Sequence, residues 1–153
     1  MENLEPVRVV LAIDGSEPSM LAADKILERH WPKGSAIHIV TAVDARIITA
    51  IAFPSAAIKK WFHEKDQDPL AWALRMHESL QKRMEHAGLI VSTLIKEEDP
   101  KDVLLDEAAD WGADCIFLGS RGLGLGDRLF LGSVSSAIAA RAHCSVEIIK
   151  GGS

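Results

Sequence analysis

Short β-branched runs alternate with helical segments along the whole chain, and this alternation restricts the fold more than any other feature of the sequence. Neighbouring parallel strands need a crossover connection, which is usually a helix and almost always right-handed. The pattern therefore predicts an α/β fold with a single doubly wound, five-stranded, mainly parallel sheet and helices on both faces. The five predicted strands are residues 7–13, 36–43, 89–96, 113–118 and 144–150.

Four segments between these runs are predicted to be helices, because polar helix-start residues precede them and glycine or proline follows most of them. Asp99-Pro100 is the clearest start, since aspartate is a good N-cap and proline suits the first helical position. Pro69 is expected to start or kink the regular part of the second helix. The predicted helices follow residues 14–18 up to about residue 31, and cover about residues 57–87, 100–111 and 133–142, with a loop containing one helical turn at residues 44–56.

Helical spacing also predicts the inward faces of two helices. A histidine on such a face is more often a packed core residue than a ligand. The predicted inward residues are Leu70, Leu74, His77, Leu80 and Met84 on the second helix and Leu104, Ala108 and Trp111 on the third.

Length and composition are those of one ordinary folded domain, which we expect to span residues 1–153. Hydrophobic residues make up 48% and charged residues 25%, which argues against a disordered chain. The net charge of -5 leaves no basic surface for nucleic acid. The composition therefore favours a folded protein whose ligand is not nucleic acid.

The two cysteines, Cys115 and Cys144, lie in apolar runs, the usual place for an unreactive thiol, and they indicate a reducing compartment. Histidine and cysteine also lack the close spacing of a zinc site. The amino-terminal residues do not resemble a signal peptide, and no apolar run has the length of a membrane span. We expect a cytoplasmic protein with no membrane partner.

A glycine-rich segment follows the fourth predicted strand and ends at the start of the fourth helix. Gly119-Ser120-Arg121-Gly122 and Gly132-Ser133 together give the pattern G-x2-G-x9-G-S. Glycine lets backbone N–H groups approach phosphate oxygens, and a helix start offers unpaired N–H groups and partial positive charge. The hydroxyls of Ser133 and Ser135 can add donors, and Arg121 and Arg128 can meet phosphate charge. The segment is therefore predicted to hold phosphates.

Asp14, Gly15 and Ser16 follow the first strand and should lie at the same sheet edge, because ligands of open α/β sheets sit beyond the carboxyl ends of the strands. Asp14 is expected to accept a hydrogen bond from ribose or to bind the Mg²⁺ that accompanies phosphates. Alternatively, its carboxylate only shapes the turn before the helix. A glycine-rich stretch can also be a flexible turn, but its place between strand and helix, facing Asp14, favours nucleotide binding.

Over residues 7–150 the chain resembles the universal stress protein family. Asp14 and Ser16, Asp99-Pro100, Trp111-Gly112-Ala113-Asp114 and Gly119–Gly122 with Gly132-Ser133 carry the resemblance. For the nucleotide-binding branch, the resemblance implies strand order 3-2-1-4-5, an adenine nucleotide alpha-hydrolase-like fold, and ATP, ADP or AMP as ligand, with Mg²⁺ where phosphates bind it.

Transferred residue by residue, the resemblance implies that Asp14 holds ribose or phosphate and that the backbone of Ala42 meets adenine. The phosphates would lie against the glycine-rich loop and the following helix. The implied nucleotide-binding residues are Asp14, Gly15, Ser16, Ala42, Gly119, Ser120, Arg121, Gly122, Gly132, Ser133, Val134 and Ser135.

Many members of the family form dimers through their last strand, so the resemblance also implies a homodimer through residues 144–150. Here that strand begins Cys144-Ser145-Val146-Glu147, where the family usually has proline followed by aliphatic residues. Glu147 is therefore an unexpected charge at the implied interface.

The leading hypothesis is a regulatory protein in which ATP orders residues 119–131 and alters a dimer or protein-partner surface. The sequence shows no general base and no Ser-His-Asp arrangement beside the phosphate residues, so no catalytic residue is assigned and at most slow ATP hydrolysis is expected. The alternatives are an ATP-hydrolysing or nucleotidyl-transferring enzyme on the same fold, and a nucleotide-free dimeric interaction module. The apolar residues of 44–56 are either core under a loop or a lid or docking patch.

Overall fold

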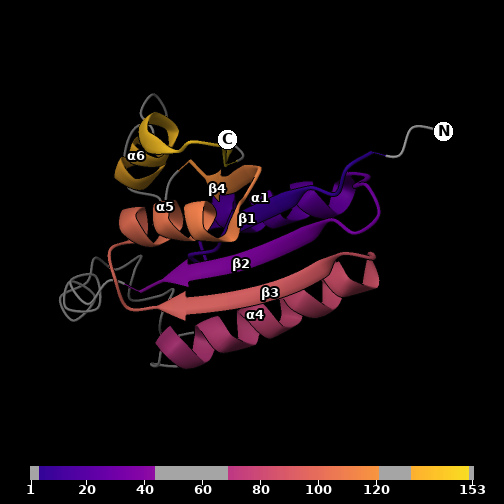
Figure 1. Cartoon of the computed structure of the whole chain (residues 1–153). Helices are drawn as coiled ribbons and strands as arrows, with labels where there is room; N and C mark the ends of the chain where they lie inside the picture. Colours follow the sequence, from indigo (N-terminus) through magenta and orange to yellow (C-terminus); the bar gives the residue numbers. More distant parts are fainter. Residues whose placement is uncertain (1–3, 44–68, 121–131, 152–153) are drawn as a thin grey trace.

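A computed structural model describes residues 4–43, 69–120 and 132–151, and these residues form one five-stranded sheet flanked by four helices (Figure 1). All strand pairs are parallel and their order is β3-β2-β1-β4-β5. The predicted fold class and strand order are confirmed. The strands are β1 (Arg8–Ala12), β2 (Ala36–Ala42), β3 (Ile90–Lys96), β4 (Cys115–Gly119) and β5 (Ser145–Ile149). The helices are α1 (Glu17–Glu28), α4 (Pro69–His86), α5 (Pro100–Trp111) and α6 (Ser133–Arg141).

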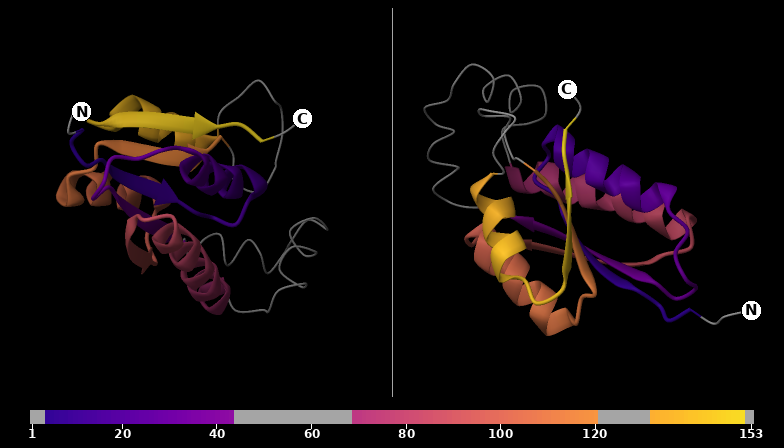
Figure 2. Two further views of the ribbon diagram at one scale, coloured as in Figure 1. Left: turned by 90° about the vertical axis from the view of Figure 1, so that its right-hand side faces the viewer. Right: turned by 90° about the horizontal axis from the view of Figure 1, so that it is seen from above.

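The helices cover the sheet from both sides. Seen from above, α1 and α4 lie side by side on one face, and α5 and α6 lie on the other (Figure 2). Successive strand residues point to opposite faces, so Val9 and Leu11 pack toward α1 and α4 while Val10 packs toward α5. This burial on both faces explains why the central strands are continuously apolar in sequence.

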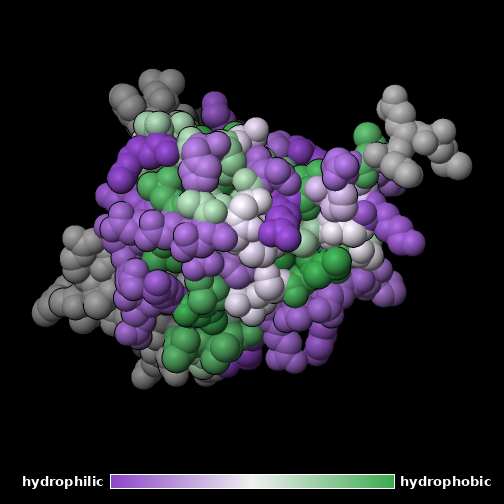
Figure 3. Space-filling model, in the orientation of Figure 1, coloured by the Kyte–Doolittle hydropathy of each residue, from purple (hydrophilic) through white to green (hydrophobic). Residues whose placement is uncertain are grey.

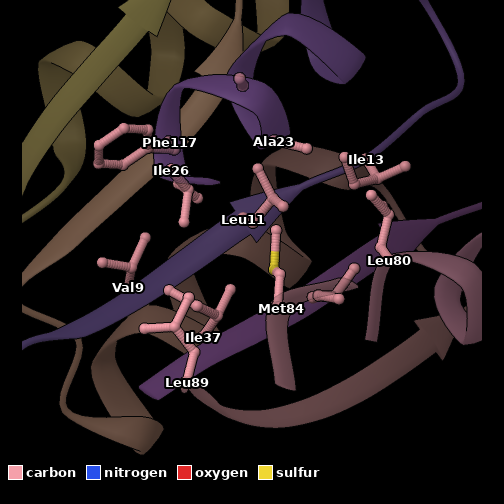
Figure 4. Packing of buried hydrophobic residues seen from close by; sticks show 12 residues of the cluster. Val9, Leu11, Ile13, Ala23, Ile26, Ile37, Leu80, Met84, Leu89 and Phe117 are labelled. Carbon is pink, nitrogen blue, oxygen red and sulfur yellow. The ribbon is translucent and has the colours of Figure 1, made fainter. Parts of the chain in front are cut away.

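The larger core lies between the sheet and the pair α1 and α4 (Figure 4). Leu11 of β1, Ile26 of α1 and Met84 of α4 are fully buried there. The smaller core contains Ile116 of β4 and Ile138 of α6. Burying one such aliphatic side chain stabilises the fold by about 1.5–3 kcal/mol, so both helical layers are held mainly by apolar contact.

The inward face predicted for α4 is partly wrong. Leu70 and Leu74 are 46% and 56% exposed, and green surface lies over the start of α4 in Figure 3. At 100° per residue, Leu74 lies well round the helix from the buried stripe, and Leu70 belongs to the first turn. The buried residues of α4 are Ala73, His77, Leu80 and Met84, and Met76 packs against the same core while partly buried.

Helix starts follow the predicted signals. Asp99 caps α5 through a hydrogen bond from the Lys101 N–H to Oδ1 (2.9 Å), and Ser16 caps α1 through the Ser19 N–H. Pro69 begins α4 rather than kinking it. The predicted inward residues of α5 pack into the smaller core. The third helix prediction is therefore confirmed at both its start and its face.

The cysteines are partly buried, which is less burial than the sequence predicted. Burial, followed by the charge of Glu147, raises the pKa of the Cys115 thiol to about 11. Burial also raises the pKa of Cys144. Because the thiolate is the reactive form, both thiols should be unreactive at neutral pH.

Candidate functional site

The candidate site lies beyond the carboxyl ends of three adjacent parallel strands. Asp14 follows β1, Ala42 ends β2 and Gly119 ends β4. Because β1 pairs with both β2 and β4, these three strand ends meet at one edge of the sheet. The predicted gathering of site residues from distant parts of the sequence is therefore what the topology produces.

Asp14 shapes the turn between β1 and α1. Its Oδ1 atom accepts hydrogen bonds from the Ser16 backbone N–H (2.9 Å) and the Ser16 hydroxyl (2.5 Å). Gly15, with φ of 84°, supplies the left-handed residue that this turn requires. Among the described residues the Oδ2 atom has no hydrogen-bond partner, and Asp14 is exposed. The turn role and a ligand role are thus compatible, because each uses a different oxygen.

The carbonyl of Ser120 fixes the two ends of the glycine-rich segment. It accepts hydrogen bonds from the Gly132 N–H and the Ser135 hydroxyl, both at 2.8 Å. The Ser120 N–H in turn donates to the Ile149 carbonyl at the end of β5 (2.8 Å). Residues 120 and 132 are therefore held together, whereas Arg121, Gly122 and Arg128 lie outside the described residues.

Ser135 does not present its hydroxyl to a ligand in this arrangement. The residue is 2% exposed. Its hydroxyl also donates a hydrogen bond of 3.2 Å to the Gly132 carbonyl. Its single proton is committed to backbone carbonyls, so only its backbone N–H remains for a phosphate. The predicted hydroxyl donor at this position instead positions the loop ends.

The amino terminus of α6 differs from those of α1 and α5. No side chain caps it, because its N-cap residue is Gly132. The first hydrogen bond closing this helix runs from the Ser136 N–H to the Gly132 carbonyl, so the N–H groups of Ser133, Val134 and Ser135 have no intrahelical acceptor. Three N–H groups with the positive end of the helix dipole suit an anionic group.

Gly119 lies where β4 meets the first turn of α1. A Cβ added to Gly119 would stand 2.6 Å from the Pro18 Cβ and 2.8 Å from both the Pro18 carbonyl carbon and the Ser19 nitrogen. Glycine is thus required here by close approach of two backbones. Its role in the described residues is to bring α1 against the end of β4.

A buried hydrogen-bond chain lies directly behind this edge and was not found from the sequence. Thr41 donates its hydroxyl proton to the Ile13 carbonyl (2.6 Å), and the same oxygen lies 2.7 Å from Nε2 of His77. Because the hydroxyl proton is already used, Nε2 of His77 must be the donor. Nδ1 is then a buried acceptor, and no atom of the described residues donates a hydrogen bond to it.

Burial, and secondarily the charge of His38, lowers the pKa of His77 to about 4. The ring is therefore neutral at physiological pH. The expectation that His77 is a packed residue is confirmed by its 3% exposure. Its partner Thr41 lies 36 residues away in the sequence, so only the packing of α4 on β2 brings the two side chains together.

Within residues 4–43, 69–120 and 132–151, no cluster of three or more histidine, cysteine, aspartate or glutamate side chains has the geometry to hold a metal ion. None of the described helices is both long and apolar enough to cross a membrane.

The strand order and the helical layers on both faces define a doubly wound α/β protein with a parallel five-stranded sheet. A sequence model described as the universal stress protein family matches residues 7–150. The chain therefore belongs to the universal stress protein family.

Similar proteins agree with this assignment. Universal stress protein Sll1388 from Synechocystis is 34% identical over 102 residues, covering 66% of this chain and 62% of the relative, so the match spans less than two thirds of that protein. The structure of MJ0577 has a TM-score of 0.78 at 21% identity, covering 96% of this chain and 97% of the other. The Arabidopsis thaliana universal stress protein At3g01520, solved with AMP bound, has a TM-score of 0.69 at 23% identity, covering 97% and 94%.

Proposed function

We propose that this protein binds an adenine nucleotide at the carboxyl edge of its sheet and acts as a regulatory protein rather than as an enzyme that turns the nucleotide over. The observation that carries the proposal is the uncapped start of α6, which has three N–H groups free of intrahelical bonds and is held beside the end of β4, the strand that pairs with β1 before Asp14. Anions bind at such helix starts. The AMP-bound Arabidopsis relative supports the adenine nucleotide as the ligand class.

Each residue has a distinct task in this proposal. The backbone of Ala42 contacts adenine, and the free carboxylate oxygen of Asp14 accepts a ribose hydroxyl or holds Mg²⁺ through the phosphates. The backbone of Ser133, Val134 and Ser135 contacts the phosphates, while Ser16 and Gly15 keep Asp14 in place. The glycine-rich residues Gly119, Ser120, Arg121, Gly122 and Gly132 complete the phosphate side.

The proposed regulatory cycle uses ATP with Mg²⁺ as the ligand and ordering of residues 119–131 as the response. The response is read by a protein partner or by a second copy of the chain, in the cytoplasm. In the proposed dimer the last strands of two copies meet. Glu147 fits this arrangement because its carboxylate pairs with both terminal nitrogens of Arg29 within the same chain, which neutralises the charge.

Calorimetric titration with Mg-ATP tests the nucleotide site. Gly122→Val and Gly132→Val should each weaken binding at least about 100-fold, since a side chain would displace N–H groups from the phosphates, at a cost of about 3 kcal/mol. Gly88→Asn is the matched control, because Gly88 lies in open space and asparagine tolerates its positive φ of 91°. Unchanged affinity in both valine variants would contradict the site.

Two further measurements separate the alternatives. Nucleotide released from the purified protein and identified by mass spectrometry would exclude the nucleotide-free interaction module. Phosphate release from Mg-ATP above the buffer rate would support the slow ATP-hydrolysing alternative, and a rate equal to the buffer would support regulation without turnover.

A further inference from the structure

A second chemical site lies on the α5 face of the sheet, away from the strand ends. His38 of β2 is paired in register with Ser92 of β3, and Glu107 of α5 lies above them. Nδ1 of His38 is 2.7 Å from Ser92 Oγ, and Nε2 is 3.0 Å from Glu107 Oε2. The three side chains thus form one hydrogen-bonded chain from acid through imidazole to hydroxyl.

The direction of the protons in this chain follows from the chemistry of its members. The carboxylate of Glu107 can only accept, so Nε2 of His38 carries a proton. In the form of the ring that carries only this proton, Nδ1 is the unprotonated nitrogen and accepts the Ser92 hydroxyl proton. An acid that orients a histidine, which accepts the proton of a serine, is the arrangement that activates a serine nucleophile.

The histidine is held rigidly, whereas the serine is accessible. His38 is 8% exposed, and its ring lies 5.2 Å from the Trp111 ring with a 31° tilt. Arg8 fixes Trp111 through a 2.7 Å hydrogen bond to its carbonyl and lies over its ring. Ser92, by contrast, is exposed on β3, an outer strand of the described sheet.

A backbone donor for a developing oxyanion stands next to the serine. The Ile90 N–H donates to the Ser35 carbonyl, and the Lys96 carbonyl accepts from the Val43 N–H. The backbone N–H and C=O groups of the even-numbered residues of β3 therefore point toward β2. In a parallel strand the intervening residues point the other way. The N–H of Thr93, the residue after Ser92, is therefore directed to the open side of β3 within the described sheet.

We propose that Ser92 is the nucleophile of an acyl-transfer site that accepts small activated acyl esters. Ser92 Oγ attacks the carbonyl carbon and its proton passes to His38 Nδ1, while the Thr93 N–H bonds the oxyanion. The bond from carbon to the leaving oxygen then breaks, and its electron pair stays on that oxygen. His38 Nδ1 donates its proton to the same oxygen. Water attacks the acyl-Ser92 ester by the same proton path, giving a carboxylic acid and free Ser92.

This inference does not depend on nucleotide binding, because none of its residues lies at the carboxyl edge described above. The expectation from the sequence concerned such arrangements only beside the phosphate residues, and this one lies elsewhere in the fold. The acid and the imidazole are 69 residues apart and the imidazole and hydroxyl 54 apart, so only the folded sheet brings them together.

Reaction with p-nitrophenyl acetate tests the site by the rate of p-nitrophenolate release and by peptide mapping of the acetyl group. The wild-type protein should carry acetyl on Ser92, and Ser92→Ala should lose both this adduct and the initial burst. His38→Phe should lower the acylation rate at least about 100-fold, the size of a general-base contribution. Thr93→Pro, which removes the outward N–H from an outer strand, should lower it about 100-fold as well.

Ser79→Ala is the matched control, since Ser79 is an exposed serine on α4 and should leave the rate unchanged. Circular dichroism of each variant checks the fold, and Ser92→Ala should keep the wild-type spectrum and Mg-ATP affinity. Acetyl groups found only on lysine side chains or the amino terminus would overturn the proposal. An undiminished Ser92 acylation rate in folded His38→Phe would overturn it equally.

Discussion

His77 is expected to make folding stability strongly dependent on pH in the mildly acidic range. Burial, with a smaller effect of His38, lowers its pKa to about 4 in the folded protein. The ordinary value for histidine is about 6.5, which applies to the unfolded chain. Between these two values the unfolded chain binds a proton that the folded protein does not, so stability falls as pH drops from about 6.5 to about 4.

The magnitude follows from the difference between the two pKa values. A gap of about 2.5 pKa units at 1.36 kcal/mol each amounts to roughly 3 kcal/mol in total, of which about 2 kcal/mol is lost between pH 7 and pH 5. Two kcal/mol is a large share of the free energy of unfolding of a typical domain. The prediction is therefore measurable by urea unfolding at the two pH values.

His77→Leu isolates this contribution from those of the carboxylates. The substitution removes the buried Nδ1 acceptor, which has no hydrogen-bond partner in the described part of the chain, and Thr41 keeps its own proton donated to Ile13. Losing the hydrogen bond from Nε2 costs about 1 kcal/mol, and removing an unsatisfied buried group returns about 1–3 kcal/mol. Stability at pH 7 should thus be equal or higher, and the loss on going to pH 5 should be about 2 kcal/mol smaller than in the wild type.

His86→Leu is the control on the same helix, because His86 is exposed at the end of α4. It should leave the pH dependence unchanged. If wild type and His77→Leu lose the same free energy of unfolding between pH 7 and pH 5, the folded ring does not resist protonation and the reasoning is refuted.

Two other substitutions test packing and assembly. Gly119→Ala should lower the free energy of unfolding by about 2 kcal/mol and Tm by roughly 4–8 °C, because the added methyl meets backbone atoms of Pro18 and Ser19. An unaltered Tm by calorimetry would show that α1 can move away from β4 and would contradict this prediction. Ile148→Pro should convert the proposed dimer to a monomer in sedimentation experiments. The Ser145 N–H bonds toward β4, so by alternation the Ile148 N–H faces the open edge of β5, and a wild-type monomer at high concentration would contradict the dimer itself.

Most of the fold could be predicted because its signals are local. Each β-branched run became a strand, and the runs of the central strands are apolar throughout because both faces of those strands are buried. Asp99-Pro100 started a helix because both residues suit those positions independently of their surroundings. The face of α4 was harder. Leu74 has the residue type of a core position but lies off the stripe that contacts the sheet, and that contact depends on how α4 is rotated against β2 and β3.

In the candidate site, the positions of the residues were predictable, whereas the availability of their polar atoms was not. That Asp14, Ala42 and Gly119 would share one edge followed from parallel order alone. The strand order did not indicate which hydroxyl groups remain free to bind a ligand. The hydroxyl of Ser135 was predicted as a phosphate donor, yet it bonds to the Ser120 and Gly132 carbonyls, and the Ser16 hydroxyl is engaged by Asp14 and the Ser19 N–H.

This distribution of donors has a consequence for how a phosphate would be recognised. Two serines near the edge donate their hydroxyl protons within the protein: Ser16 to the Asp14 carboxylate and Ser135 to the Ser120 carbonyl. In the proposed site, recognition therefore depends on backbone N–H groups at the start of α6, which any residue type except proline supplies. The informative sequence positions are therefore the glycines that let the backbone approach, and serines in such loops are better interpreted first as the groups that hold that backbone in place.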